Sequence, residues 1–172
     1  MLKKNKCVFL DRDGTLIKDK HYLNKINKIE FIKNTVKGLK YFQNSGFLLI
    51  IISNQSGVAK KIISKKKLED INKYIIRYLK NKDIIIKKIY NCIHNPEDNC
   101  VCRKPKKYFG LKAKKRFNLD FKKSLMIGDK NSDRIFAYNL KLKFFRIGKK
   151  NKSINDVYKK YLNKEKENYA RL

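Results

Sequence analysis

The sequence is poor in the residues that interrupt a folded chain. It contains 2 Pro and 7 Gly among 172 residues, and it has no stretch rich in Ser and Gly. Hydrophobic residues make up 42% of the chain and are spread along its length, so long disordered segments are not expected. A chain of this length fits one folded domain, which we predict to span residues 1–172.

Long apolar runs are also missing. The run at 7–10 follows three lysines and stops at Asp11, far short of the core of a signal peptide. The longest run, at 47–52, is too short to cross a lipid bilayer. We therefore expect a cytoplasmic protein with no membrane partner.

Acidic residues are scarce, since 15 Asp and Glu stand against 45 Lys and Arg, which gives a formal net charge of +30. Such a charge is typical of proteins that bind nucleic acid or anionic surfaces. However, 38 Lys, 21 Ile and 18 Asn indicate an A/T-rich genome, and the lysines are scattered over every segment. We therefore interpret the charge as a solvated basic surface and expect no specific nucleic-acid partner.

Short apolar runs alternate with amphipathic stretches, which predicts an α/β fold with a Rossmann-like parallel sheet flanked by helices. The apolar runs predict strands at 7–10, 47–52, 84–90, 124–127 and 144–147. Capping signals and periodicity predict helices from Asn34 to before Gly46, from Ser64 through Leu79, from near Pro105, over 131–140 and over about 153–172.

Polar residues follow three of these predicted strands directly. Asp11 follows the first strand, Ser53 the second, and Gly128 with Asp129 the fourth. Because open α/β sheets bind ligands at the carboxyl edge of their strands, we expect these side chains to share one crevice.

Asp11 and Asp13 place two carboxylates close together at a strand end, and Gly14 allows the chain to turn away. Two like charges at this spacing are unfavourable alone. Mg²⁺ prefers hard oxygen ligands, and Asp129 can complete such a set. From the residues alone, a magnesium site and ordinary turn and cap residues both remain open.

A second group of ligands lies within eleven positions, namely Cys92, His94, Cys100 and Cys102. Three thiolates and an imidazole form a tetrahedral set that is typical of structural zinc, and a short loop has little apolar surface to hold its shape otherwise. Disulfides are the alternative, but a cytoplasmic location and the C-x-C spacing disfavour them. We predict a zinc loop over 92–102 and a buried core position for Cys7.

Four motifs occur in order along nearly the whole chain: Asp11-Arg12-Asp13-Gly14-Thr15, Ser53-Asn54-Gln55, Lys104, and Gly128-Asp129-Lys130-x-x-Asp133. In this order they resemble the motifs of the haloacid dehalogenase superfamily. The C-x-H followed by C-x-C-R-K-P at 92–105 resembles its histidinol-phosphatase-type branch. The resemblance implies the haloacid dehalogenase fold without a large cap.

The resemblance also implies a reaction. Asp11 is expected to attack phosphorus and form an aspartyl-phosphate, while Asp13 protonates the leaving alcohol and then activates water. Ser53 and Lys104 are expected to bind the phosphoryl oxygens, with Arg103 and Lys104 held over the mouth of the site by the zinc loop.

Magnesium would bind Asp11, the backbone carbonyl of Asp13, and Asp129, and the expected cofactors are therefore Mg²⁺ and Zn²⁺. Asp133 is expected to hold either Lys130 or a metal-bound water, and the sequence does not decide between them.

The segment 53–59 is similar to the corresponding segment of the heptose-bisphosphate phosphatases in this branch. This similarity implies a monomer that hydrolyses the 7-phosphate of a heptose 1,7-bisphosphate, in the ADP-heptose synthesis that supplies the lipopolysaccharide core. The implied substrate-binding residues are Arg12, Asp19, His21, Tyr22, Asn54, Gln55, Ser56, Arg103 and Lys130. Lys60-Lys61 replaces the usual Arg-Gly of this group.

Three alternative functions remain open at this stage. A histidinol-phosphate phosphatase would share the motifs and the zinc loop. A phosphatase acting on nucleic-acid 3′ ends would combine the motifs with the basic surface. A basic nucleic-acid-binding zinc module, which is not an enzyme, would make the carboxylates incidental.

Overall fold

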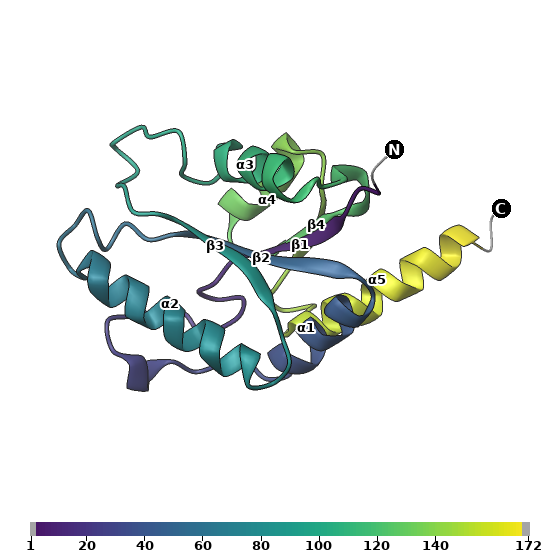
Figure 1. Ribbon diagram of the computed structural model, residues 1–172, viewed down its shortest axis with the longest axis horizontal. Helices are drawn as coiled ribbons and strands as arrows, with labels where there is room; N and C mark the ends of the chain where they lie inside the picture. Colours follow the sequence, from purple (N-terminus) through teal and green to yellow (C-terminus); the bar gives the residue numbers. More distant parts are fainter. Residues whose placement is uncertain (1–2, 170–172) are drawn as a thin grey trace.

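A five-stranded parallel sheet forms the centre of the computed structural model, which describes residues 3–169 and their side chains through residue 163 (Figure 1). The strand order is β3-β2-β1-β4-β5, and every neighbouring pair is parallel. The strands are β1 Lys6–Leu10, β2 Phe47–Asn54, β3 Ile86–Cys92, β4 Leu125–Gly128 and β5 Lys143–Arg146.

Helices cover both faces of the sheet, with α3 and α4 on one face and α1, α2 and α5 on the other (Figure 1). Their bounds are α1 Thr35–Asn44, α2 Lys65–Lys80, α3 Tyr108–Phe117, α4 Asn131–Asn139 and α5 Ile154–Tyr169, with short 3-10 turns at Ile26–Lys28 and Phe121–Lys123. The last three residues of the predicted C-terminal helix, 170–172, lie outside the described residues.

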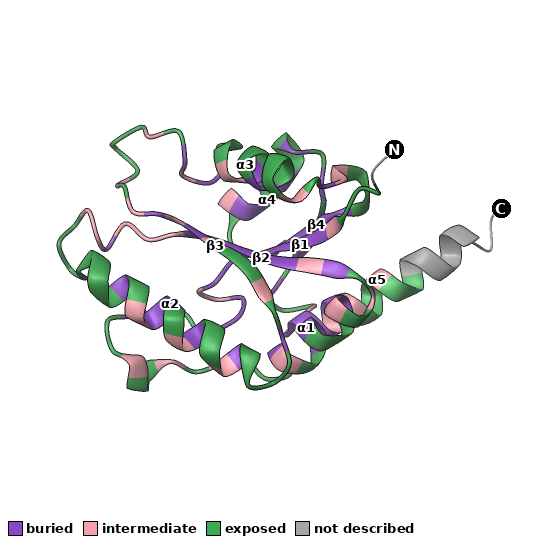
Figure 2. Ribbon diagram, in the orientation of Figure 1, coloured by how far each residue is buried: buried purple, intermediate pink, exposed green. Residues whose placement is uncertain are grey.

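Alternation along the strands divides the core into two apolar layers. In β1, Val8 and Leu10 pack with residues of α1, α2 and α5, whereas Cys7 and Phe9 pack with residues of α3 and α4. All four side chains are fully buried, and the centre of the sheet is buried on both faces (Figure 2). Burial raises the pKa of the Cys7 thiol to about 12, in line with its predicted core position.

The sheet and its helices confirm the predicted fold class. The segments 11–34 and 93–107, which leave the carboxyl edge, contain among the described residues a single 3-10 turn, as expected for a fold without a large cap. Within residues 3–169, no helix is long and apolar enough to cross a membrane.

The strands β2 and β3 each end two residues later than predicted, and two predicted starts were also wrong. The third helix begins at Tyr108 rather than near Pro105, because the preceding segment is held by a turn from Lys106 N to Arg103 O at 2.8 Å and by the Asn139 side chain on Pro105 O. The strand β3 begins two residues later than predicted, because the Ile85 N–H donates to the Gln43 side chain instead of to the sheet.

Candidate active site and metal-binding loop

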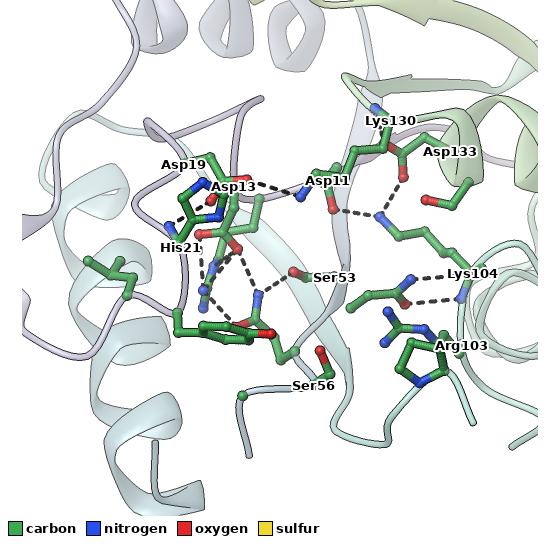
Figure 3. A pocket seen from close by; sticks show the side chains of 18 residues that line it. Asp11, Asp13, Asp19, His21, Ser53, Ser56, Arg103, Lys104, Lys130 and Asp133 are labelled. Carbon is green, nitrogen blue, oxygen red and sulfur yellow. Dashed lines mark hydrogen bonds and ion pairs between the residues drawn. The ribbon is translucent and has the colours of Figure 1, made fainter. Parts of the chain in front are cut away.

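The strand register brings the polar residues of three strand ends to within one residue of the same level. Leu10 pairs with Ile51 on one side and with Ile127 on the other, so Asp11 lies level with Ile52 and Gly128, one residue before Ser53 and Asp129. A cavity of about 410 Å³ opens at this edge (Figure 3). All the residues predicted as catalytic or substrate-binding line it, whereas Asp129 lines a neighbouring hollow.

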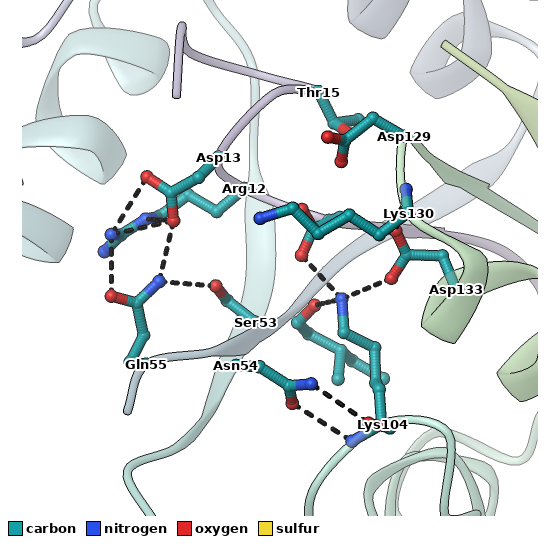
Figure 4. Close-up of polar contacts among 12 residues, drawn as sticks. Arg12, Asp13, Thr15, Ser53, Asn54, Gln55, Lys104, Asp129, Lys130 and Asp133 are labelled. Atoms are coloured by element: carbon teal, nitrogen blue, oxygen red, sulfur yellow. Dashed lines mark hydrogen bonds and ion pairs between the residues drawn. The ribbon is translucent and has the colours of Figure 1, made fainter. Parts of the chain in front are cut away.

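Lys104 lies at the base of the cavity, where it is only 3% exposed. Its Nζ lies 2.5 Å from Asp11 Oδ1, 2.7 Å from Asp133 Oδ1 and 2.6 Å from the Ile52 carbonyl oxygen (Figure 4). Burial alone would lower the pKa of Lys104, but the two carboxylates outweigh it and raise the pKa. Lys104 therefore stays charged beside the predicted nucleophile.

These contacts correct one expectation and add to another. Lys104 does not lie over the mouth of the site, because its side chain is buried at the base of the cavity, where it meets Asp11. The Asp133 carboxylate accepts a hydrogen bond from the Lys130 backbone N–H at 3.0 Å, which agrees with one of its two expected roles, and it also pairs with Lys104 Nζ. Gly128 permits this arrangement, because a Cβ there would collide with the Asp133 carboxylate.

Replacing Lys104 by Met should destabilise the metal-free protein by about 3–5 kcal/mol, since two buried carboxylates would lose their shared cation. Lys107→Met is the matched control, because Lys107 is exposed, and it should change the free energy of unfolding by less than about 0.5 kcal/mol. Urea unfolding without Mg²⁺ measures both variants. Equal stability of Lys104→Met and wild type would contradict the ion-pair assignment.

Three carboxylates gather beside the cavity. One oxygen each from Asp11, Asp129 and Asp133 lies within 4.8 Å of the others. Burial, followed by the charge of Asp11, raises the pKa of Asp129 to about 6. Burial also raises the pKa of Asp11, against the opposing charge of Lys104. Hard oxygen ligands held this close fit a divalent cation, whose charge would relieve their repulsion.

The Asp13 carboxylate is turned away from this cluster. Arg12 donates two hydrogen bonds to it, from Nε to Oδ2 at 3.0 Å and from Nη2 to Oδ1 at 3.1 Å. The Gln55 amide donates to Oδ2 at 2.7 Å (Figure 4). Gln55 Nε2 also donates to Ser53 Oγ at 2.7 Å. Asp13, Ser53 and Gln55 therefore form one hydrogen-bonded wall of the cavity.

Arg12 and Asn54 were predicted to bind substrate, and in the structure both side chains form hydrogen bonds with neighbouring residues. Arg12 is only 1% exposed, and its N–H groups are directed to Asp13, Gln55 and Asn72. The Asn54 side chain donates to the Lys104 carbonyl and accepts from the Lys104 N–H, both at 3.0 Å. In this structure the two residues hold neighbours in place, which the motif pattern alone did not show.

The remaining predicted residues line the mouth. Lys130 Nζ lies 3.0 Å from Asp19 Oδ2, and this pairing outweighs the effect of burial to raise the pKa of Lys130. Tyr22 packs over Gly57, where an added Cβ would lie 2.7 Å from the ring. Arg103 lines the cavity and donates to the His94 carbonyl at 3.2 Å. The mouth thus presents cations to an incoming anion.

His21 and Tyr22 both have positive φ, at 42° and 50°, in the loop that carries Asp19. The His21 N–H donates to Asp19 Oδ1 at 3.1 Å, which stabilises this turn. Non-glycine residues seldom adopt such angles except where the surrounding structure imposes them.

The four predicted zinc ligands converge in the loop after β3. Cys92 Sγ lies 3.5 Å from Cys100 Sγ, Cys100 Sγ lies 3.7 Å from Cys102 Sγ, and His94 Nδ1 lies 3.4 Å from Cys102 Sγ. A tetrahedral zinc with bonds of about 2.0 to 2.3 Å separates its ligands by roughly 3.5 to 3.8 Å. The sulfur separations are far too long for disulfides, and all four cysteines of the chain are free.

Asn72 is a buried polar residue that the sequence reasoning missed. It lies on α2 and is 7% exposed, and its Oδ1 accepts from Arg12 Nη1 at 3.0 Å. The sequence contained a signal for this buried position, because Asn72 comes four residues after Leu68 and therefore lies on the apolar face of the helix. A polar residue within such a face needs a buried partner.

The fold and this cavity, with an aspartate at the end of the first strand and a buried lysine beside it, define a phosphatase of the haloacid dehalogenase type. A family model described as polynucleotide kinase 3 phosphatase matches residues 6–147. The D-glycero-beta-D-manno-heptose-1,7-bisphosphate 7-phosphatase of Helicobacter pylori J99 is 38% identical over 144 residues, which cover 83% of each chain.

The D-glycero-alpha-D-manno-heptose-1,7-bisphosphate 7-phosphatase of Campylobacter jejuni is 36% identical over 93% of this chain and 92% of its own. The chain therefore belongs to the haloacid dehalogenase superfamily of phosphatases, in the family that groups it with the heptose-1,7-bisphosphate 7-phosphatases. Its fold is also that of the D,D-heptose 1,7-bisphosphate phosphatase of B. bronchiseptica, crystallised with magnesium and phosphate, with a TM-score of 0.77 and 18% identity over 92% of this chain and 99% of that one.

Proposed function

We propose that this chain is a magnesium-dependent phosphatase that removes the 7-phosphate of D-glycero-D-manno-heptose 1,7-bisphosphate. The observation that supports this most strongly is the identity of 36% or more to enzymes named for that reaction, over 83% to 92% of their length. The cation-rich mouth around Arg103 and Lys130 suits a substrate with a second phosphate.

Asp11 is the proposed nucleophile. Its carboxylate oxygen bonds to phosphorus as the bond from phosphorus to the sugar oxygen breaks, and Asp13 donates a proton to that oxygen. Asp13 then takes a proton from water as the water attacks phosphorus and frees Asp11. Ser53 and Lys104 would hydrogen-bond the phosphoryl oxygens, where negative charge develops.

A magnesium ion held by Asp11, Asp129 and the Asp13 carbonyl would supply charge neutralisation between nucleophile and phosphate. The carboxylates of Asp11 and Asp129 lie close enough for this role, and Gly14 allows it, because a Cβ there would collide with the Asp129 carboxylate. Asp133 stays with Lys104 and orients it.

The loop at 92–102 is proposed to bind zinc as a structural ion. The four ligand atoms lie within 4.8 Å of one another, and four protein ligands would complete the coordination of zinc without substrate or water. Its effect on the reaction would pass through Arg103 and Lys104, which follow the last ligand directly.

A comparison of three substrates at equal concentration tests the proposed specificity. We expect kcat/KM to be at least about 100-fold higher for heptose 1,7-bisphosphate, in one or both anomers, than for histidinol phosphate. The third substrate is a 3′-phosphorylated oligonucleotide, since the matching family model carries that description. A higher kcat/KM for either competitor would replace the heptose assignment by that substrate.

We propose further that residues 1–172 form one catalytic domain that acts as a cytoplasmic monomer without a specific nucleic-acid partner. A cytoplasmic location agrees with four free cysteines, three of them placed as metal ligands. Supply of the lipopolysaccharide core would follow from the proposed substrate.

A further inference from the structure

A continuous hydrogen-bonded chain runs from helix α2 to the carboxylate of Asp13. Asn72 Oδ1 accepts from Arg12 Nη1 at 3.0 Å, and Arg12 then holds both oxygens of Asp13. Gln55 closes the chain by accepting from Arg12 Nη2 at 2.9 Å and donating to Asp13 at 2.7 Å. Both carboxylate oxygens of Asp13 therefore accept hydrogen bonds from side chains that have further hydrogen-bond partners of their own.

The position of Arg12 depends on Asn72. Arg12 is the largest fully buried side chain of the described residues, and its guanidinium has no solvent to complete its hydrogen bonds. A planar guanidinium binds a carboxylate in two-point fashion only when its plane is set. Asn72 supplies a contact on the Nη1 side, opposite the nitrogens that hold Asp13.

The remaining buried side chains of α2 are apolar, namely Leu68, Ile71, Ile75 and Leu79. A leucine at position 72 would complete that apolar face and cost nothing in helix propensity. The presence of a buried amide there points to its contact with Arg12 rather than to packing.

We propose that Asn72 is a positioning residue for the phosphatase reaction, which sets the Arg12 guanidinium and through it the orientation of the Asp13 carboxylate. The inference rests on the proposed role of Asp13 as acid and base. It predicts that loss of the Asn72 oxygen disturbs the proton-transfer steps and leaves nucleophilic attack by Asp11 intact.

Presteady-state hydrolysis of 4-nitrophenyl phosphate by Asn72→Leu, loaded with both metals, tests this prediction. Nitrophenolate is a good leaving group, so the first step needs no acid, whereas hydrolysis of the aspartyl-phosphate still needs Asp13 to activate water. We expect a burst of about one nitrophenolate per active site, followed by a turnover about 10-fold or more slower than in wild type.

Two further variants separate positioning from stability. Asn72→Asp keeps an acceptor oxygen for Arg12 and should return turnover to within about 3-fold of wild type. Ile75→Val removes a methylene from the same buried face without touching the chain to Asp13, so it should lower the melting temperature and leave turnover unchanged.

The inference would be overturned if Asn72→Leu showed no burst and wild-type turnover, or if Asn72→Asp lost as much activity as Asn72→Leu. An equal loss of turnover in Ile75→Val would assign the effect to stability and overturn it as well. Because the aryl phosphate contains no sugar, failure of the heptose assignment would leave this result unaffected.

Discussion

Replacing Asp11 by Asn is expected to lower kcat at least about 10⁴-fold, because the amide keeps the shape of the side chain but cannot attack phosphorus. The fold should persist, since Lys104 keeps its ion pair with Asp133 at 2.7 Å and loses only one of its two carboxylates. Phosphate release at saturating substrate and Mg²⁺, with a melting curve for each protein, measures both effects.

Asp83→Asn is the matched control for this substitution. The Asp83 carboxylate is 85% exposed and pairs with the surface residue Lys40, and Asn tolerates its positive φ of 59°. It should retain wild-type kcat. More than about one tenth of wild-type kcat in Asp11→Asn would contradict the assignment of the nucleophile.

Removal of the proposed zinc is expected to affect stability and activity together. Cys100→Ser should lower the zinc content below one per chain and the free energy of unfolding by at least about 3 kcal/mol, because the loop has little apolar core of its own. Activity should fall because Lys104 lies only two residues after Cys102, and its backbone is held by the Asn54 side chain.

Metal analysis, urea unfolding and phosphate release on the same preparation measure these effects. Cys7→Ala is the control, since Cys7 is buried in β1 far from the loop in sequence, and it should keep the zinc and the activity at a cost of about 1 kcal/mol. A zinc-free Cys100→Ser protein with full activity and stability would show that the loop has no structural ion to lose.

The sheet was predictable because its strands are buried on both faces and therefore read as apolar runs. The apolar runs at 7–10 and 47–52 lie within β1 and β2. Asp11 follows the first run, Ser53 follows the second, and both line the cavity. The ends of β3 and α3 were less predictable, because side chains from other segments, such as Gln43 and Asn139, fix them.

The motif residues were found from sequence, but the direction of several side chains was not. Arg12 was predicted to bind the substrate, and it lines the cavity, but its contact with Asn72, 60 positions away in the chain, was not predicted. Asn54 likewise meets Lys104, 50 positions away. A motif states which residues gather at a strand end, whereas the choice among their possible partners depends on helix packing that only the folded chain determines.

The most direct test of the proposed function is ³¹P NMR of D-glycero-D-manno-heptose 1,7-bisphosphate incubated with the enzyme and Mg²⁺. We expect the signal of the phosphate on carbon 7 to disappear as the inorganic phosphate signal grows, while the anomeric phosphate signal persists. Loss of the anomeric phosphate, or no release from a folded, zinc-loaded protein that hydrolyses histidinol phosphate, would contradict the proposed function.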